Sequence, residues 1–352
     1  MQVRMLALYG LDRRPNLVLL LLCALCLSLQ GCGRAPDPPA AADADSVAAA
    51  APLLGYERVE WPTEPTGVAG FSVGPWNFIQ VSGVAVTPQG NVLVLHRGAH
   101  PLKEFRSDGM FVRALNAGEI SEGKVGFIPQ ANWTPDRSRY SAVYGPAGCT
   151  SCGAHSVRID PAGNVWVVDA TGHVVYKRDP GGRELMRLGT QGVAGVGANT
   201  FNLPTDVAFG ADGAIYVTDG YGNARVVKYA SDGTYLLEWG TRGQGPGQFG
   251  LPHNVVTDKQ GRVYVTDRDN QRVQVFDANG TFLSQWRDTG GVSGLGITDD
   301  QQIWTGPVLR DLDGKVLGRL PDATGGHAVA IGSSGEVYIA QLSGVAQKFV
   351  RR

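Results

Sequence analysis

The sequence predicts an all-β protein built as a six-bladed β-propeller. Glycine accounts for 49 of the 352 residues, about twice its usual share of ~7%, and the apolar residues fall in short runs between turns, as in strands. Residues 56–352 also repeat one unit six times. A unit of about 50 residues with four strands has the size of a propeller blade, so a helical bundle and a doubly wound α/β fold are disfavoured.

The charge composition excludes one class of partner. The 31 basic and 32 acidic residues give a formal net charge of −1, whereas nucleic-acid-binding proteins usually carry a basic face. We therefore expect no nucleic-acid partner. The hydrophobic share of 43% is enough to fill a large core. We also expect the protein to be a monomer.

The N-terminal segment is typical of a bacterial lipoprotein signal. Three arginines precede an apolar run over residues 17–29, namely Arg4, Arg13 and Arg14. The run is shorter than the about 20 residues that a transmembrane helix needs, but it suits a secretory signal. It ends in Leu29-Gln30-Gly31-Cys32, which resembles a lipobox. The resemblance implies cleavage before Cys32 and lipid attachment to that cysteine; an uncleaved or ordinarily cleaved signal is the alternative.

Residues 33–54 are rich in Ala, Pro and Asp, and we expect them to form a disordered tether because they cannot bury a core. The expected layout is a signal peptide over 1–31, the lipidated cysteine and disordered tether over 32–55, and the propeller over 56–352. Lipid would then hold the protein to a membrane of the bacterial cell envelope, on the periplasmic face of the outer membrane or outside the cell. Gly33, in place of an aspartate after Cys32, favours the outer membrane.

Cys149 and Cys152 are the two cysteines left after the signal segment and Cys32. Two cysteines this close predict a disulfide in an oxidising compartment, and no βαβ pattern supports a thioredoxin-like site. A Cys-x-x-Cys-x-x-His metal site with His155 is the alternative. Both cysteines lie in an insertion, residues 116–152, that we expect to form a loop over one face.

The repeated unit is clearest in three segments: HSVRIDPAGNVWVVD from His155, TDVAFGADGAIYVTD from Thr205 and HNVVTDKQGRVYVTD from His253. Weaker copies begin at Ser82, Ser293 and His327. Apolar residues that alternate with period two predict half-buried strands, and the Asp-Gly and Asn-Gly turns that follow predict hairpins.

These units resemble NHL repeats, most closely at Asp267, Asn270, Arg272 and Val273. We interpret the aspartates and arginines that recur from blade to blade as scaffolding at turns and strand ends. Residues 56–59 are expected to supply an outer strand that closes the ring onto the last blade.

Histidine recurs at one position of the repeat. The residues that start the first strand of each unit are Ser82, His155, Thr205, His253, Ser293 and His327. Histidine thus occupies every second blade, and because the first strand lines the central channel, three imidazoles should meet at the axis. Three protein ligands with an open fourth position suit a catalytic zinc ion. The sequence therefore predicts a metal site made of His155, His253 and His327.

A second register carries arginine. Arg97 and Arg268 stand at the end of the second strand in blades one and four, which face each other across the ring, and Tyr221 should lie near the same channel mouth. Guanidinium groups bind carboxylates in a bidentate way. Nearby positive charges favour the deprotonated form of a tyrosine, which could then act as a base. Surface arginines in salt bridges between blades are the alternative.

Together these residues resemble the peptidyl-α-hydroxyglycine α-amidating lyase (peptidylamidoglycolate lyase) family, over roughly residues 75–350. The resemblance rests on stretches such as VLVLHRGAH, LPTDVAFGADGAIYVTDGYGNARVV, VYVTDRDNQRVQVF and GGHAVAI. It implies that the three histidines bind zinc, that Tyr221 is the catalytic base and that Arg97 and Arg268 bind the substrate carboxylate. The implied reaction cleaves a C-terminal α-hydroxyglycine peptide, or a similar α-hydroxy-amide, to an amide and glyoxylate.

The sequence also departs from this family. Asn202 and Gly222 stand at the positions of one family disulfide, and Tyr264 and Val275 at those of the other. The family's structural calcium would use carbonyls near Val84 and Val157 and an acid where this chain has Ala328, so the calcium ligand set is incomplete.

Two further alternatives concern function. The first is a non-catalytic, lipid-anchored NHL propeller that binds a peptide or a protein. The second is a lactonase-type hydrolase, which would need an acidic metal cage that this register lacks. If the lyase interpretation holds, either a partner oxygenase supplies the hydroxylated substrate, or the natural substrate is another α-hydroxy-amide, such as an N-acyl or ureido analogue.

Overall fold

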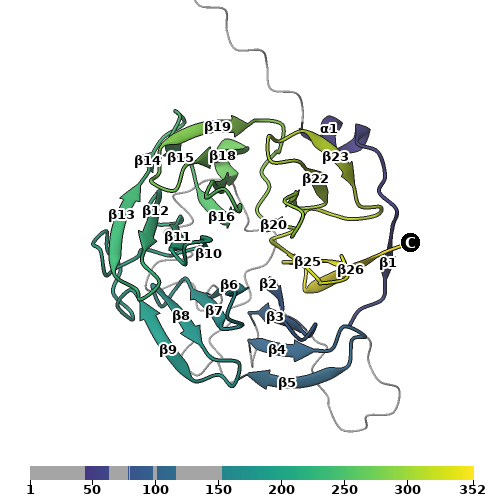
Figure 1. Cartoon of the computed structure of the whole chain (residues 1–352), viewed down its shortest axis with the longest axis horizontal. Coiled ribbons are helices and arrows are strands. Elements are labelled where there is room, and N and C mark those ends of the chain that lie inside the picture. The colour runs from purple at the N-terminus through teal and green to yellow at the C-terminus, as the bar shows by residue number, and fades with distance from the viewer. Residues whose placement is uncertain (1–43, 63–77, 79, 98–100, 116–152) are drawn as a thin grey trace, which may run out of the picture. The chain divides into compact units, whose positions relative to one another are not determined.

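The computed structural model describes residues 44–62, 78, 80–97, 101–115 and 153–352. In this part of the chain the strands form six four-stranded sheets and one two-stranded sheet. Figure 1 shows the six larger sheets as blades around a central axis, with the first strand of each blade nearest the axis. The predicted all-β fold, a six-bladed β-propeller, is confirmed.

Blades one to three follow each other along the chain. Blade one contains β2 (Val81–Val86), β3 (Val92–His96), β4 (Leu102–Phe105) and β5 (Phe111–Leu115). Blade two contains β6 (Ala154–Ile159), β7 (Val165–Asp169), β8 (Val174–Arg178) and β9 (Glu184–Leu188). Blade three contains β10 (Asp206–Phe209), β11 (Ile215–Asp219), β12 (Arg225–Tyr229) and β13 (Tyr235–Trp239).

A short parallel pair, β14 (Thr241–Arg242) and β15 (Gln248–Phe249), precedes blade four. Blade four contains β16 (Pro252–Thr257), β17 (Val263–Asp267), the 3-10 helix η2 (Arg268–Asn270), β18 (Arg272–Phe276) and β19 (Phe282–Trp286). Blade five contains β20 (Leu295–Ile297), β21 (Ile303–Thr305), β22 (Val308–Arg310) and β23 (Val316–Arg319). Blade six contains β24 (Ala328–Ile331), β25 (Val337–Gln341) and β26 (Val345–Arg351).

The outer strand of blade six comes from the other end of the described chain. Strand β1 (Tyr56–Val59) pairs antiparallel with β26, with Tyr56 opposite Arg351. The Tyr56 hydroxyl donates to the Gly335 carbonyl at 3.0 Å, and its ring packs edge-on against Trp304 of blade five at 5.9 Å. The expected closing strand is therefore present, and it completes the sheet of blade six with a strand from the N-terminal part of the described chain.

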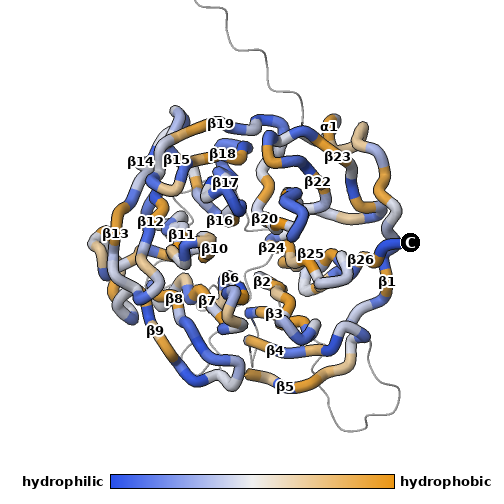
Figure 2. The backbone as a smooth tube through the Cα atoms, in the orientation of Figure 1, coloured by the Kyte–Doolittle hydropathy of each residue, from blue (hydrophilic) through white to orange (hydrophobic). Residues whose placement is uncertain are grey.

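The hydrophobic core is divided into clusters between neighbouring blades. One cluster joins Leu93 and Leu95 of blade one to Val167 of blade two, and another joins Val273 of blade four to Leu295 of blade five. Figure 2 shows hydrophobic stretches in every blade rather than on one side of the ring. Because each inner strand packs between its two neighbours, side chains at one register are held at a common height.

The aspartates and arginines that recur in the repeat are buried scaffolding, as interpreted from the sequence. Arg225 Nε lies 3.0 Å from Asp219 Oδ2 in blade three, and Arg272 Nε lies 2.9 Å from Asp267 Oδ2 in blade four. Each arginine also donates to a backbone carbonyl of the segment that enters its blade. These contacts fix the turns from which the functional side chains project.

The expected tether is ordered at its C-terminal end, contrary to our prediction for residues 32–55. Helix α1 spans Ala44–Ala50, and the next residues run along β23, where Leu54 N donates to Arg319 O and Arg319 N donates to Pro52 O, both at 2.9 Å. The prediction failed because Leu54 packs into the apolar cluster of blades five and six, which composition alone does not reveal.

Several expectations concern residues outside the described ranges. These are the signal peptide, the lipidated Cys32, the insertion over residues 116–152 and the pair Cys149 and Cys152. Within the described ranges, no helix has the length and apolar character needed to span a membrane.

Candidate metal centre

The three histidines predicted from the register converge at the axis. His155 lies in β6 and His253 in β16, and His327 directly precedes β24. Their ring centroids are 4.7, 4.8 and 4.9 Å apart, so they form a nearly equilateral triangle, as expected for residues from every second blade. One ligand atom from each ring lies within 4.8 Å of the others. All three residues are buried.

Each imidazole is held by its Nδ1 atom. Nδ1 of His155 lies 2.6 Å from the Thr205 carbonyl oxygen, and Nδ1 of His327 lies 2.7 Å from the Ser82 carbonyl oxygen. Nδ1 of His253 lies 3.2 Å from Oδ1 of Asn254. Because these oxygens only accept hydrogen bonds, each Nδ1 carries the proton and each Nε2 keeps its lone pair. Ser82 and Thr205 stand at the same register in blades one and three, so the register also supplies two of the acceptors.

Burial lowers the pKa of all three imidazoles. It is the main reason that the pKa of His327 falls to about 3 and that the pKa values of His155 and His253 fall well below the ordinary 6.5. The positive charge of Arg268 acts in the same direction on all three rings. Neutral imidazoles at neutral pH are the form that binds a metal ion.

The donor set fits a zinc ion. His327 Nε2 is buried and has no hydrogen-bond partner, a costly arrangement for a polar atom unless a ligand satisfies it. Three neutral imidazoles match the protein ligands of many catalytic zinc sites. Among the residues that the structure describes, His155, His253 and His327 form a group of side chains close enough to share a metal ion.

Tyr221 lies against two of the histidines. Its hydroxyl is 3.0 Å from His155 Nε2 and 3.3 Å from His253 Nε2, and its ring packs edge-on against both imidazoles. The turn after β11 reaches the axis because residue 220 is glycine: a Cβ atom there would lie 2.0 Å from the Pro252 carbonyl oxygen. Tyr221, predicted as a catalytic residue, thus contacts two of the three histidines directly.

The two arginines approach the centre from blades one and four. The Arg268 guanidinium, at the start of η2, lies 5.7 Å from the centre of the Tyr221 ring. Arg97 follows β3, is 3% exposed and donates from Nη1 to Gln80 Oε1 at 3.1 Å. Its charge lowers the pKa of His155 and His327. The structure thus brings Arg268 onto Tyr221, and it places the charge of Arg97 within reach of the histidines.

Sequence reasoning missed Gln80 and Asn254. Gln80 holds Arg97 and has a left-handed backbone, with φ of 49°, but no motif marks it. Asn254 follows His253 directly, so its place beside the histidine register was the available signal.

The other expected positions lie as follows. Val84 and Val157 are buried on neighbouring inner strands, β2 and β6. At the first pair of family disulfide positions, the Asn202 side chain fills the space over Gly222, where a Cβ atom would meet it at 2.1 Å. Tyr264 and Val275 face each other across β17 and β18.

Comparisons with known proteins agree with this architecture. A family model described as NHL repeat matches residues 201–229 and 249–276, which lie largely in blades three and four. The chain is similar to "Streptogramin B lyase structure", a solved structure with a TM-score of 0.51 and 13% identity that covers 84% of this chain and 98% of that one. At this identity the likeness concerns the fold alone.

Two curated relatives carry names that bear on function. "Peptidylglycine alpha-amidating monooxygenase" of Rattus norvegicus is 36% identical over 166 residues, which is 46% of this chain and 16% of the rat protein. "Probable peptidyl-alpha-hydroxyglycine alpha-amidating lyase pgal-1" of Caenorhabditis elegans is 29% identical over 289 residues, which is 75% of this chain and 80% of that protein. The match thus spans less than a fifth of the rat protein. The chain is a six-bladed propeller with NHL repeats, similar to proteins named as amidating lyases.

Proposed function

We propose that this protein is a zinc-dependent lyase that cleaves the C–N bond of C-terminal α-hydroxyglycine peptides, or of similar α-hydroxy-amides, to an amide and glyoxylate. The observation that carries the proposal is the Tyr221 hydroxyl, which lies within 3.3 Å of Nε2 in both His155 and His253. A purely structural ring has no need of an ionisable hydroxyl among three buried imidazoles. The name of the worm relative, a probable amidating lyase, supports the same reaction class.

The proposed substrate has two groups that these residues can recognise. Its carboxylate would bind to the guanidinium groups of Arg97 and Arg268, which present planar sets of donors to an anion. Its α-hydroxyl would then lie near the three Nε2 atoms and the Tyr221 hydroxyl. Arg97 and Arg268 bring positive charge next to neutral imidazoles, which favours an anionic substrate, and Asp269 offsets part of it from 3.3 Å beside Arg268 Nε.

The reaction needs one proton to move. As the C–N bond breaks, the hydroxyl oxygen loses its proton and becomes the aldehyde oxygen of glyoxylate, while the amide nitrogen takes the electron pair of the broken bond and gains a proton. Tyr221 would accept the first proton and return one to the nitrogen, so the enzyme is unchanged after one turnover. Zinc bound by His155, His253 and His327 would supply a positive charge that makes the substrate hydroxyl more acidic.

The test is glyoxylate release by the purified protein from an N-acyl-α-hydroxyglycine peptide. We expect turnover with about one zinc ion per chain, its loss after treatment with a chelator, and its return when zinc is added back. A protein that binds zinc but leaves this substrate intact would contradict the proposed substrate. A protein that neither binds zinc nor cleaves this substrate would favour the alternative of a propeller that only binds a peptide or a protein.

We also propose that lipid on Cys32 anchors the protein to a membrane of the bacterial envelope. The support is the apolar run and the Leu-Gln-Gly-Cys sequence that ends it. Expression with a radiolabelled fatty acid should label the wild-type protein and not the Cys32→Ala variant. An unlabelled wild-type protein in a host that processes lipoproteins would contradict the anchor and would leave the proposed reaction unaffected.

A further inference from the structure

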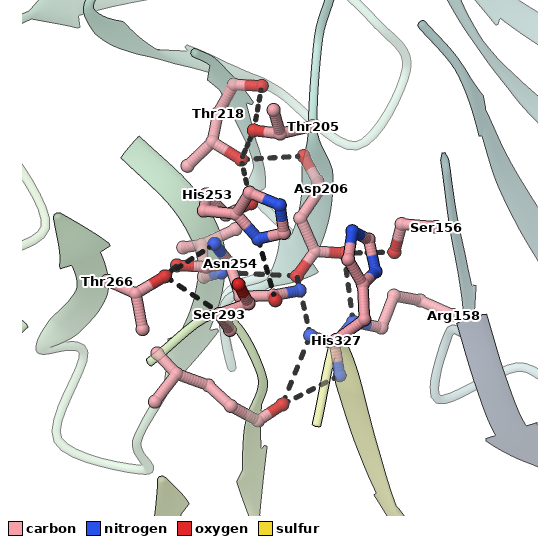
Figure 3. Close-up of polar contacts among 12 residues, drawn as sticks. Ser156, Arg158, Thr205, Asp206, Thr218, His253, Asn254, Thr266, Ser293 and His327 are labelled. Carbon is pink, nitrogen blue, oxygen red and sulfur yellow. Dashed lines mark hydrogen bonds and ion pairs between the residues drawn. The ribbon is translucent and has the colours of Figure 1, made fainter. Parts of the chain in front are cut away.

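A buried carboxylate organises the channel beside the histidines. Asp206, at the start of β10, is 0% exposed and accepts hydrogen bonds from the side chains of Ser156, Arg158 and Asn254 and from Val255 N. Arg158 neutralises its charge through contacts of 2.5 and 3.0 Å and also donates to the Leu295 carbonyl of blade five. Figure 3 shows these polar contacts converging on Asp206 from several blades.

Asn254 links this carboxylate to a histidine. Its Nδ2 atom donates to Asp206 Oδ2 at 2.5 Å, and its Oδ1 atom lies 3.2 Å from Nδ1 of His253. The two ends of an amide differ, because the nitrogen only donates and the oxygen only accepts. An ionised carboxylate only accepts, so Asp206 draws the amide nitrogen toward itself and thereby turns the amide oxygen toward His253.

His253 differs in this respect from the other two histidines. Nδ1 of His155 and of His327 meets a backbone carbonyl, which cannot exchange its acceptor for a donor. The side-chain amide of Asn254 could rotate by half a turn and present its NH₂ group to Nδ1 instead. His253 would then carry its proton on Nε2, where the lone pair is needed for the ion.

We propose that Asp206 is a positioning residue for the metal centre: through Asn254 it fixes the tautomer in which His253 presents the Nε2 lone pair to the shared ion. The inference rests on the zinc site of the proposed function and does not depend on the proposed reaction. Partners that orient a ligating histidine in this way typically change metal affinity by about 10–100-fold when they are removed.

The variants separate amide orientation from general stability. Asn254→Leu removes the acceptor for His253 and leaves the Asp206–Arg158 pair in place. Asn254→Asp alone would place a second carboxylate where Asn254 Nδ2 now donates to Asp206 at 2.5 Å. Because two buried carboxylates repel each other, this change is used only together with Asp206→Asn. Asp206→Asn removes the group that orients Asn254, and Asp206→Asn combined with Asn254→Asp tests whether that loss is rescued. Ser156→Ala is the matched control, because it removes another donor to Asp206 that does not contact an imidazole.

Two measurements decide the proposal. Zinc affinity is measured by competition with a chromophoric chelator, and the tautomer of His253 is measured by ¹⁵N NMR of the zinc-free protein. We expect Asn254→Leu and Asp206→Asn to weaken zinc binding by about 10–100-fold and to reduce the population with the proton on Nδ1. The double variant and Ser156→Ala should stay within about threefold of the wild type, since their acceptors for His253 remain.

A zinc-free wild type with the proton on Nε2 of His253, or an Asn254→Leu variant that binds zinc as tightly as the wild type, would overturn the proposal. Failure of the double variant to recover the affinity lost in Asp206→Asn would overturn the role of Asp206. If the wild type binds no zinc, the proposed function fails, while the tautomer in the zinc-free protein still decides the role of Asn254. Because Asn254→Leu leaves the ion pair of Asp206 intact, the test survives even if Asp206→Asn does not fold.

Discussion

The hydroxyl of Tyr221 lies 3.0 Å from Nε2 of His155, the ring nitrogen that its Nδ1 contact with the Thr205 carbonyl leaves as an acceptor. The pair joins the turn after β11 to the inner strand of blade two. The proposed proton-transfer group and a proposed metal-ligating atom therefore lie close together at the axis. Because either side chain can be changed without removing the other, variants can test the role of the tyrosine apart from that of the histidines.

Replacement of Tyr221 by Phe should abolish turnover and leave the zinc site filled. The variant keeps the ring that packs against His155 and His253 but loses the group proposed to move the proton, which is worth about 10²–10⁴-fold in rate. Glyoxylate release and zinc content measured on the same sample check this. His327→Ala is the contrasting variant, because it should lose zinc as well as activity. Turnover of Tyr221→Phe within tenfold of the wild type would refute the assignment of Tyr221 as base.

Replacement of Arg268 by Ala should raise KM for the hydroxyglycine substrate by about 10–100-fold, the range expected for losing a hydrogen bond to a charged group. The KM for an analogue without the carboxylate should be the same in the variant and the wild type. Steady-state kinetics with both substrates measure the difference. Arg183→Ala, which removes a 78% exposed arginine side chain on an outer turn, serves as the control. A KM that changes equally for both substrates would contradict carboxylate recognition by Arg268.

The histidine site was predictable because a repeat converts sequence register into position. Each blade has the same strand order, so residues at one register lie at one height, and alternate blades place His155, His253 and His327 around the axis. The same regularity made the closing strand at Tyr56 predictable. Arg97 and Arg268 share a second register, and Tyr221 lies one position beyond it, so their place near one channel mouth was also predictable.

Contacts between distant segments could not be predicted from the sequence. Asn254 meets Asp206 from another blade, 48 residues away, and nothing in either local sequence announces that pairing. The docking of Leu54 near β23 was missed for the same reason, because residues 33–54 read as a polar, flexible segment. In both cases the tertiary partner, rather than local composition, decides the structure.

Removal of the Tyr56 side chain should destabilise the closed ring. Tyr56 is 7% exposed, packs on Trp304 and bonds to Gly335, and truncating a buried aromatic residue costs about 3–5 kcal/mol. Urea unfolding of Tyr56→Ala measures the loss in the free energy of unfolding. Leu53→Ala, at a position that is 60% exposed, is the control and should change it by less than about 0.5 kcal/mol. Equal stability of the two variants would mean that β1 does not hold the ring closed.

Asp169 occupies the scaffold position of blade two without the arginine found in the next two blades. Asp219 pairs with Arg225 and Asp267 with Arg272 across the same strands, but the residue opposite Asp169 is Val174. Burial raises the pKa of Asp169 from 3.8 to about 6, although Gly172 N donates to its Oδ1 atom at 2.8 Å.

The raised pKa of Asp169 predicts a pH dependence of stability. Between about pH 4 and pH 6 the folded protein holds a proton on Asp169 that the unfolded chain releases, so the contribution of this group to stability is present below about pH 4 and is lost as the pH rises through 6. Asp169→Asn has no such loss. Its free energy of unfolding relative to the wild type should therefore rise by up to about 3 kcal/mol between pH 4 and pH 7. Urea unfolding at several pH values measures the difference, and Asp300→Asn, at an exposed position, controls for the removal of one negative charge. A difference between Asp169→Asn and the wild type that stays constant, or shrinks as the pH rises, would show that Asp169 is not held protonated by burial.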